Sequence, residues 1–277
     1  GGGTAMTLRR IATVVVTLLL LTTATADARR VIRVLAIGNS FSEDAVEHYL
    51  YELAAAQGDS LVIGNAYIGG CSIDRHWANA QAAKPEYRYR KIVGGHTTTR
   101  KNVDLATIIR DDQWDIITLQ QASHFSGLPY TYAHLQHLKD YVLATSTNPR
   151  VQIAWHLTWA YPATSTHSAF KYYGRSQQRM YSNLLLTAAE VLPRVGITRV
   201  IPVGITIQLA RQEMGDVMNR DGFHLQLAYG RYAAACTWCE FLTGRSVVGN
   251  PYRPAGVDAA TARLMQRLAH RALRVKI

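Results

Sequence analysis

The sequence has 277 residues, of which 48% are hydrophobic, and its formal net charge at pH 7 is +11. This length and apolar content suit one large α/β domain, or at most two small ones, with an ample core. The lysines and arginines are scattered and accompany no nucleic-acid-binding motif, so the charge indicates a solvated basic surface and no nucleic-acid partner. A mild preference for acidic polysaccharide or for an anionic cell envelope is compatible with this surface.

The amino-terminal segment has the pattern of an export signal. Arg9 and Arg10 precede an apolar stretch at residues 11–21, which is too short to span a bilayer. The small residues that end at Ala26 are typical of a cleavage site. We therefore expect residues 1–28 to comprise a signal peptide and an upstream remnant. Removal of the signal would leave a secreted or periplasmic protein with no stable membrane insertion.

Strand-like and helix-like patterns alternate along residues 29–277, which we expect to form a single domain. The predicted strands are residues 31–37, 61–68, 114–120, 151–158 and 198–203. The predicted helices are residues 43–57, 74–82, 103–110, 132–145, 177–192, 204–212, 225–242 and 257–275. Residues 84–102 are expected to be irregular and polar, with a hairpin at Gly94-Gly95 as an option. The alternation predicts a three-layer α/β/α fold with helices on both faces of a doubly wound, parallel, five-stranded sheet.

The first predicted strand ends at Gly38-Asn39-Ser40, and a helical pattern follows directly. Ser40 is therefore expected at the carboxyl end of a strand, where open α/β sheets build their sites. Amides at the start of a helix lack partners and favour negative charge, so a serine there can attack a carbonyl while nearby N–H groups stabilise the oxyanion. Taken alone, Ser40 is more typical of a helix N-cap.

Three further loops carry residues of types that can take part in catalysis. Gly69-Gly70 and Gln120-Gln121 follow the second and third predicted strands, and Asp221-Gly222-Phe223-His224 precedes a long predicted helix. Because the carboxyl ends of parallel strands share one edge of a sheet, the first two loops should gather beside Ser40. Taken alone, an Asp-Gly pair is most often a turn, and a single histidine is most often a surface or capping residue.

Together these motifs resemble the SGNH subgroup of the GDSL hydrolases, which are serine esterases and lipases. That family has a nucleophile block near the amino terminus, a glycine block after the second strand, an asparagine block after the third, and a DxxH block near the carboxyl terminus. Gly38-Asn39-Ser40-Phe41-Ser42 stands at the nucleophile block, and Asp221-Gly222-Phe223-His224 matches DxxH. The resemblance covers nearly all of the chain after the signal and implies a flavodoxin-like SGNH-hydrolase fold.

The resemblance implies a role for each matching residue. Ser40 would be the nucleophile, His224 would accept and return its proton, and Asp221 would orient the imidazole. The oxyanion would be bound by the amides of Ser40 and Gly70, with Gly69 as the alternative glycine.

The third block departs from the family pattern. Leu119-Gln120-Gln121-Ala122-Ser123 replaces the usual Gly-x-Asn-Asp and resembles carbohydrate-active members that carry a glutamine there. A glutamine NH₂ group can donate to an oxyanion as asparagine does. Gln120 is the predicted donor, with Gln121 as the alternative.

Other residues are binding candidates on weaker grounds. Asn39, Trp159 and Tyr161 are candidates for sugar contact, although loop aromatics pack on the core about as often. His134, His137 and an aspartate are spaced three residues apart on a predicted helix, a pattern that can indicate a zinc site. Side chains at successive steps of three rotate around the helix axis, so these three would not converge on one ion. We therefore expect no metal and no cofactor.

The sequence has three cysteines, Cys71, Cys236 and Cys239. The last two form a CxxC inside a helical pattern, where positions three apart fit a disulfide poorly. No second CxxC and no nearby histidine completes a zinc set. We therefore expect buried free thiols.

These observations predict a secreted serine esterase that removes acetyl or similar acyl groups from a polysaccharide or oligosaccharide. The ester chemistry follows from the triad. The sugar preference rests on export, on the glutamine of the third block and on the resemblance to carbohydrate-active members of the family. A lipase or thioesterase is the alternative acyl hydrolase, against which the lack of a long apolar lid argues. A non-catalytic carbohydrate-binding protein that keeps the fold is the alternative from another class.

Overall fold

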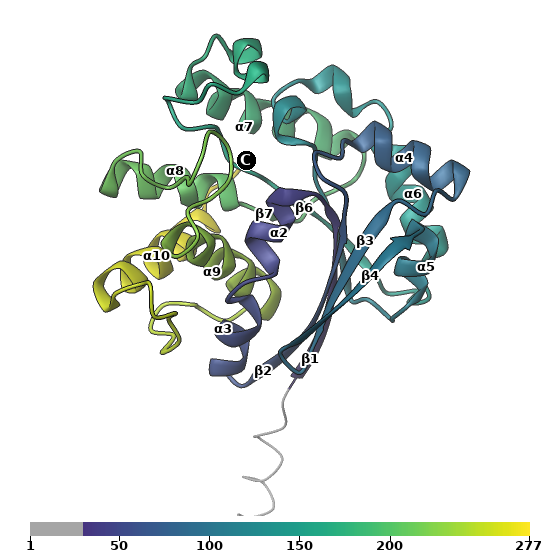
Figure 1. Ribbon diagram of the computed structural model, residues 1–277, viewed down its shortest axis with the longest axis horizontal. Helices are drawn as coiled ribbons and strands as arrows, with labels where there is room; N and C mark the ends of the chain where they lie inside the picture. Colours follow the sequence, from purple (N-terminus) through teal and green to yellow (C-terminus); the bar gives the residue numbers. More distant parts are fainter. Residues whose placement is uncertain (1–29) are drawn as a thin grey trace, which may run out of the picture.

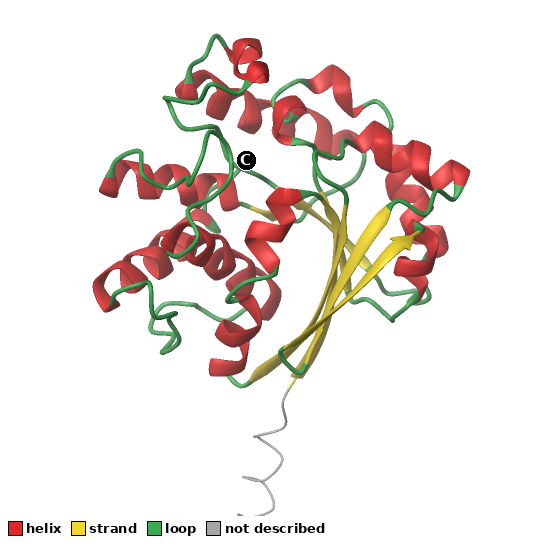
Figure 2. Ribbon diagram, in the orientation of Figure 1, coloured by secondary structure: helices red, strands yellow, loops and turns green. Residues whose placement is uncertain are grey.

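A computed structural model describes residues 30–277 of the chain, so the predicted signal segment, residues 1–28, lies outside the described residues. Figure 1 shows a central twisted sheet with helices packed against both of its faces. In Figure 2 the strands run side by side between two groups of helices, one on each side of the sheet. Within the described residues, no helix is both long enough and apolar enough to cross a membrane.

The sheet has seven strands in the order β4-β3-β2-β1-β5-β6-β7. Five of them are parallel: β1 (Arg30–Gly38), β2 (Asp59–Tyr67), β5 (Ile116–Leu119), β6 (Gln152–His156) and β7 (Val200–Ile201). Their spatial order is second, first, third, fourth and fifth along the chain, which is the doubly wound order of flavodoxin-like sheets. Such sheets bind ligands beyond the carboxyl ends of the strands where the order reverses, which here lies between β1 and β5.

The predicted count of five strands in a wholly parallel sheet is wrong, because the segment expected to be irregular forms two antiparallel strands. β3 (Tyr87–Val93) pairs with β2, and β4 (His96–Val103) pairs with β3 at the outer edge. Gly94 and Gly95 join them with φ angles of 57° and 80°, the left-handed pair that a two-residue hairpin turn requires. Every residue of β4 except Val103 is exposed, so this strand lacks the alternating apolar pattern that identifies a strand in a sequence.

Helices cover both faces of the sheet, as predicted. One face carries α2 (Ser40–Val46), α3 (Leu50–Ala56), α8 (Val203–Met214), α9 (Tyr229–Thr243) and α10 (Ala259–Ala272). The other face carries α4 (Ile73–Ala82), α5 (Leu105–Arg110), α6 (Leu135–Thr145) and α7 (Gln177–Arg194). Short 3₁₀ turns lie in the loops after β5 and β6, at Ser123–Phe125, Pro129–Tyr132 and Ser168–Tyr173.

The structure of β1 explains its nearly continuous apolar sequence. Ile32, Val34 and Ala36 pack in the layer of α2, α3 and α9, whereas Leu35 and Ile37 pack in the layer of α4 and α5. Because successive side chains of a strand point to opposite faces, a strand covered on both faces is apolar at every position. This packing fixes the place of the loop that follows β1.

The single helix predicted at residues 43–57 is two helices. α2 ends at Val46, α3 begins at Leu50, and Tyr49 between them is left-handed, with a φ of 69°. The Tyr49 hydroxyl donates to the carbonyl of Leu227 at 2.9 Å, so the break accompanies a contact with the loop before α9. Helical periodicity carries no sign of such a tertiary contact.

Candidate active site

Ser40 begins α2 at the carboxyl end of β1, and its side chain is not the helix cap. The cap is Asn39, whose Oδ1 accepts the amide of Phe41 at 2.9 Å. The Ser42 hydroxyl completes the cap by accepting the amide of Asn39 at 3.0 Å. Because its neighbours satisfy the first turn, the Ser40 hydroxyl remains available for another contact.

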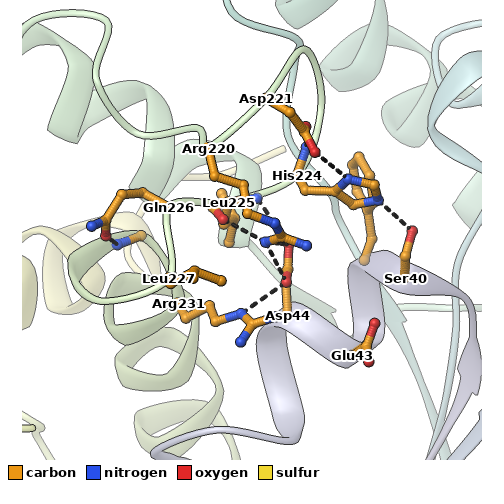
Figure 3. A network of polar contacts seen from close by, with 12 residues as sticks. Ser40, Glu43, Asp44, Arg220, Asp221, His224, Leu225, Gln226, Leu227 and Arg231 are labelled. Carbon is orange, nitrogen blue, oxygen red and sulfur yellow. Dashed lines mark hydrogen bonds and ion pairs between the residues drawn. The ribbon is translucent and has the colours of Figure 1, made fainter.

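That contact is with His224, whose Nε2 lies 2.9 Å from the hydroxyl of Ser40 (Figure 3). Nδ1 of the same ring lies 2.8 Å from Oδ2 of Asp221. The other oxygen of Asp221 accepts the amides of Phe223 at 2.9 Å and His224 at 2.6 Å. The backbone of the loop therefore fixes the carboxylate, and the carboxylate fixes the ring. This series of hydroxyl, imidazole and carboxylate can remove a proton from a nucleophilic serine.

Asp221 is held in its ionised form. Partial burial acts to raise the pKa of Asp221, but the hydrogen bonds from the backbone and ring of His224 and from the amide of Phe223 outweigh it and hold the pKa below its usual value. An ionised carboxylate keeps the proton of the neutral ring on Nδ1, which leaves Nε2 free to accept the serine proton. The ring of Phe41 packs against the imidazole, with a centroid distance of 5.9 Å.

Asp44 anchors the histidine-bearing loop to α2. Its buried carboxylate accepts from Nη1 of Arg220 at 2.9 Å and 3.2 Å, from Nε of Arg231 at 2.9 Å, and from the amide of Leu225 at 2.8 Å (Figure 3). Arg220 and Leu225 border the DxxH motif, so Asp44 fixes the loop at both ends. Sequence reasoning missed this group. The available signal was an acid placed four residues after the predicted nucleophile, on the same helix face.

Gln120 is buried next to Asn39 in a chain of bonded side chains. Its Nε2 donates to Oδ1 of Asn39 at 2.9 Å, and its Oε1 accepts from Nδ1 of His156 at 2.8 Å. Because Oδ1 of Asn39 also accepts the amide of Phe41, both amides are oriented and His156 carries its proton on Nδ1. Burial lowers the pKa of His156 to about 3, so the ring is neutral. Gln120 does not itself line the cleft that opens beside Ser40, whereas Asn39 does.

Gln121, the alternative to Gln120, is not brought to the site. Its Oε1 accepts the amides of Ile73 at 3.0 Å and Ala122 at 2.8 Å. Its Nε2 donates to the carbonyl and the hydroxyl of Thr131 at 3.1 Å and 3.2 Å. The side chain joins the loop after β5 to the start of α4 and has no donor left for a ligand.

A cleft of about 380 Å³ opens beside Ser40. Gly70 lines it and has a φ of 65°, a left-handed conformation that glycine adopts readily. Gly69 lines a neighbouring hollow instead, so Gly70 is the glycine that accompanies the serine. Other residues that line the cleft include Asn39, Phe125, His124, His167, Tyr172 and Phe223.

Trp159 and Tyr161, predicted to contact a sugar, are core residues with fully buried side chains. Trp159 stacks on Phe41 with ring centroids 4.2 Å apart and donates Nε1–H to the carbonyl of Phe223 at 2.7 Å. The hydroxyl of Tyr161 shares a hydrogen bond of 2.8 Å with Oγ of Ser123. That prediction is wrong because the loop turns its aromatic rings inward, where they support residues of the cleft wall.

Two histidines that the sequence analysis did not select, His124 and His167, line the cleft. The ring of His167 contacts the ring of Phe223 at a centroid distance of 5.0 Å, and its Nδ1 accepts the amide of Ala169 at 3.1 Å. Burial lowers the pKa of both histidines, which favours neutral rings. They follow β5 and β6, one in each loop, so no spacing in the sequence marks them.

The remaining candidates lie outside the cleft. Nδ1 of His134 is 2.8 Å from Oδ1 of Asp74, and His137 stacks on Trp77 with ring centroids 5.3 Å apart. The three cysteines are free and buried, as predicted.

The fold and site together define an α/β protein with a serine, a histidine and an aspartate in hydrogen-bonded series at the carboxyl end of its sheet. The chain belongs to the DUF4886 family, a domain of unknown function, whose model matches residues 33–272. It is similar to a DUF4886 family protein from Bacteroides uniformis, with 43% identity, a TM-score of 0.86, and coverage of 88% of this chain and 95% of that chain. No curated protein sequence matches it.

A more distant likeness concerns the fold alone. A protein described as a GDSL-like lipase from Parabacteroides merdae shares 13% identity and a TM-score of 0.50, with 78% of this chain and 98% of that chain covered. The predicted GDSL and SGNH resemblance is therefore supported at the level of the fold. The carbohydrate-esterase subgroup stays a prediction.

Proposed function

We propose that this protein is a serine esterase that hydrolyses acetyl or similarly short acyl esters of carbohydrate through an acyl-enzyme. The observation that carries the proposal is the series from Ser40 through His224 to Asp221, with contacts of 2.9 Å and 2.8 Å, beside an open cleft. A protein that only binds sugar has no need of all three groups in this arrangement.

In the first half of the reaction, Oγ of Ser40 attacks the ester carbonyl while its proton passes to Nε2 of His224. The oxyanion accepts hydrogen bonds from the amides of Ser40 and Gly70. We assign the third donor to Asn39, which lines the cleft and whose Nδ2 has a hydrogen beyond the one donated to the carbonyl of Cys71 at 3.2 Å. Gln120, predicted as that donor, then acts by orienting Asn39.

Collapse of the tetrahedral intermediate breaks the ester bond, and His224 returns its proton to the departing sugar hydroxyl. In the second half, His224 takes a proton from water, whose oxygen attacks the acyl carbon. The carboxylic acid leaves and the proton returns to Ser40. Asp221 stays ionised throughout and stabilises the imidazolium that forms in each half.

The cleft favours a short acyl group on a polar alcohol. Its volume is about 380 Å³, and its lining mixes the rings of Phe125 and Phe223 with hydroxyls and imidazoles. Hydroxyls and imidazoles can hydrogen-bond to sugar hydroxyls, whereas a long acyl chain needs a continuous apolar channel. The export expected from residues 1–28 would bring the enzyme to polysaccharide outside the cytoplasm.

Hydrolysis of p-nitrophenyl acetate, butyrate and octanoate tests the proposal in wild type, Ser40→Ala and Ser60→Ala. Ser60 lies on β2 at the opposite end of the sheet and is the matched control. We expect Ser40→Ala to lose at least about 10³-fold in kcat, and Ser60→Ala to keep it. Activity that falls with chain length and releases acetate from acetylated xylan supports the proposal. Activity that rises with chain length indicates a lipase, and no serine-dependent activity overturns the esterase.

A further inference from the structure

A second hollow, of about 340 Å³, adjoins the catalytic cleft. Gly69 lines the hollow and Gly70 lines the cleft, so the two sites meet at consecutive residues whose Cα atoms are about 3.8 Å apart. A polymer with its ester in the cleft can therefore reach the hollow. The side chains that line the hollow include Tyr67, Glu86, Arg88, Lys101 and Asn102.

Figure 1 shows the β3–β4 hairpin extending the sheet beyond β2. The hollow is lined by residues from the ends of these three strands and from the loops beside them. Arg88 pairs with Tyr67 in the register of β2 and β3, so it stands beside the strand that leads into the glycine loop. The register of β3 and β4 shifts between Tyr87 and Tyr89, and Asn102 has a φ of 55°. Irregularities of this kind redirect side chains. Here Arg88 and Lys101 reach the same hollow from two strands.

The hairpin as a whole is basic. Residues 87–103 contain arginines and lysines but no aspartate or glutamate. Some of this charge is used within the fold. Arg90 forms ion pairs with Glu43 and Glu47, and Lys91 forms ion pairs with two aspartates that follow α5.

Arg88 and Lys101, the two cations that line the hollow, differ from Arg90 and Lys91 in their ion pairing. Among the described residues, neither Arg88 nor Lys101 forms an ion pair with a carboxylate. The acid of the hollow, Glu86, pairs instead with Arg75 at 3.2 Å. The hollow therefore presents two positive charges, with no negative charge committed to them, next to the proposed scissile ester.

We infer that this hollow binds a carboxylate of the polysaccharide, so that the substrate is an acetylated acidic polysaccharide such as one built from uronic acids. The inference rests on the proposed esterase function and names its substrate class. The guanidinium of Arg88 can hold a carboxylate through paired N–H···O bonds, and Lys101 adds a second charge. Both cations are exposed, so with a neutral polysaccharide they would keep water as their partner and gain no ion pair.

The first test measures binding apart from hydrolysis, by affinity electrophoresis in gels with and without de-esterified polygalacturonate. Arg88→Ala/Lys101→Ala is compared with Arg267→Ala/Arg271→Ala, which removes the same charge from exposed positions of α10. We expect the polymer to retard wild type, Ser40→Ala and the α10 variant, and the Kd of the hollow variant to rise about three- to thirty-fold. Equal retardation of all four proteins would overturn the inference.

The second test compares acetate release from acetylated polygalacturonate and from its neutral, methyl-esterified form. We expect wild type to prefer the anionic polymer, and this preference to shrink in the hollow variant but not in the α10 variant. Raising salt from about 0.1 M to about 1 M, which shortens the Debye length from about 10 Å to about 3 Å, should also remove it. Serine-dependent hydrolysis with no preference overturns the inference alone. No serine-dependent hydrolysis overturns the esterase, and retention in the gel then still decides whether the hollow binds carboxylates.

Discussion

Asp221 accepts three hydrogen bonds, from the amides of Phe223 and His224 and from the ring of His224. Asp221→Asn keeps the size of the side chain, but its NH₂ group would face Nδ1 and force the ring proton onto Nε2. A ring protonated there cannot accept the proton of Ser40. We expect kcat for p-nitrophenyl acetate to fall by about 10³–10⁴-fold with little change in KM.

Asp258→Asn is the matched control, because Asp258 caps α10 and asparagine caps a helix equally well. Its kcat should equal that of wild type. An Asp221→Asn enzyme that kept more than a tenth of the wild-type kcat would contradict the role given to Asp221.

Variants of Asn39 and Gln120 distinguish a side chain that contacts the oxyanion from one that only positions its neighbour. Asn39→Asp keeps the oxygen that caps α2 but removes the Nδ2 donor, and we expect kcat to fall by about 10²–10³-fold. Gln120→Leu removes the bond that orients Asn39 and also the acceptor of Nδ1 of His156, but it leaves the Nδ2 donor of Asn39 in place. The loss should therefore be about tenfold, measured as kcat on p-nitrophenyl acetate in folded protein. A larger loss in Gln120→Leu than in Asn39→Asp would return the donor role to Gln120.

Single residues of the site were predictable where they belong to a short sequence motif. Ser40 follows the apolar run of β1, and Asp221 lies three residues before His224, so the sequence places all three. Asp44 and Gln120 have their partners far away in the chain, and only the fold brings those partners close. The spacing of four residues places Asp44 on the same helix face as Ser40, but it does not say which distant loop Asp44 holds.

At the scale of elements, α2 and the loop before α9 form one unit through Asp44. Arg220→Gln and Arg231→Gln each remove one cation from this carboxylate, but Arg220 lies next to Asp221 whereas Arg231 lies in α9. Each should lower the free energy of unfolding by about 1–3 kcal/mol. Only Arg220→Gln should lower kcat, by about 10- to 100-fold, because it displaces the loop that carries the base.

The measurement is kcat and KM on p-nitrophenyl acetate beside urea unfolding of both variants. A positioning role predicts a fall in kcat with KM nearly unchanged. If both variants lost stability alike and also lost kcat alike, Asp44 would act on general stability and not on the position of the loop.

Helices and strands were predictable where their burial requires a run or a regular spacing of apolar residues in the sequence. The parallel strands are covered on both faces, so their sequences are apolar runs. The helices between them have one buried face, so their apolar residues recur at helical spacing. The exposed strand β4 has no such pattern, and its only local signal was the Gly94-Gly95 turn. The break between α2 and α3 has no local signal in the sequence, because it accompanies the contact of Tyr49 with a distant carbonyl.

At the scale of the whole molecule, the two layers that cover the sheet each enclose a neutral histidine. Burial lowers the pKa of both His76 and His156 to about 3. In the unfolded chain each would bind a proton near pH 6.5. As pH falls below about 6.5, the unfolded chain therefore holds more protons than the folded one. The free energy of unfolding should fall by about 1.4 kcal/mol per pH unit for each histidine, until the pH approaches 3.

His156→Asn isolates one of these contributions, because an asparagine amide can replace the Nδ1 donor to Gln120 and does not titrate. Between pH 7 and pH 5, wild type should lose about 2 kcal/mol more stability than His156→Asn, measured by urea unfolding at both values. His137→Asn, at an exposed position, should lose as much as wild type. Equal losses in wild type and His156→Asn would mean that His156 is protonated in the folded state. Protonation would then add a hydrogen at Nε2 while Nδ1 still donates to Gln120, so the orientation of Gln120 and Asn39 behind Ser40 would be the same at both pH values.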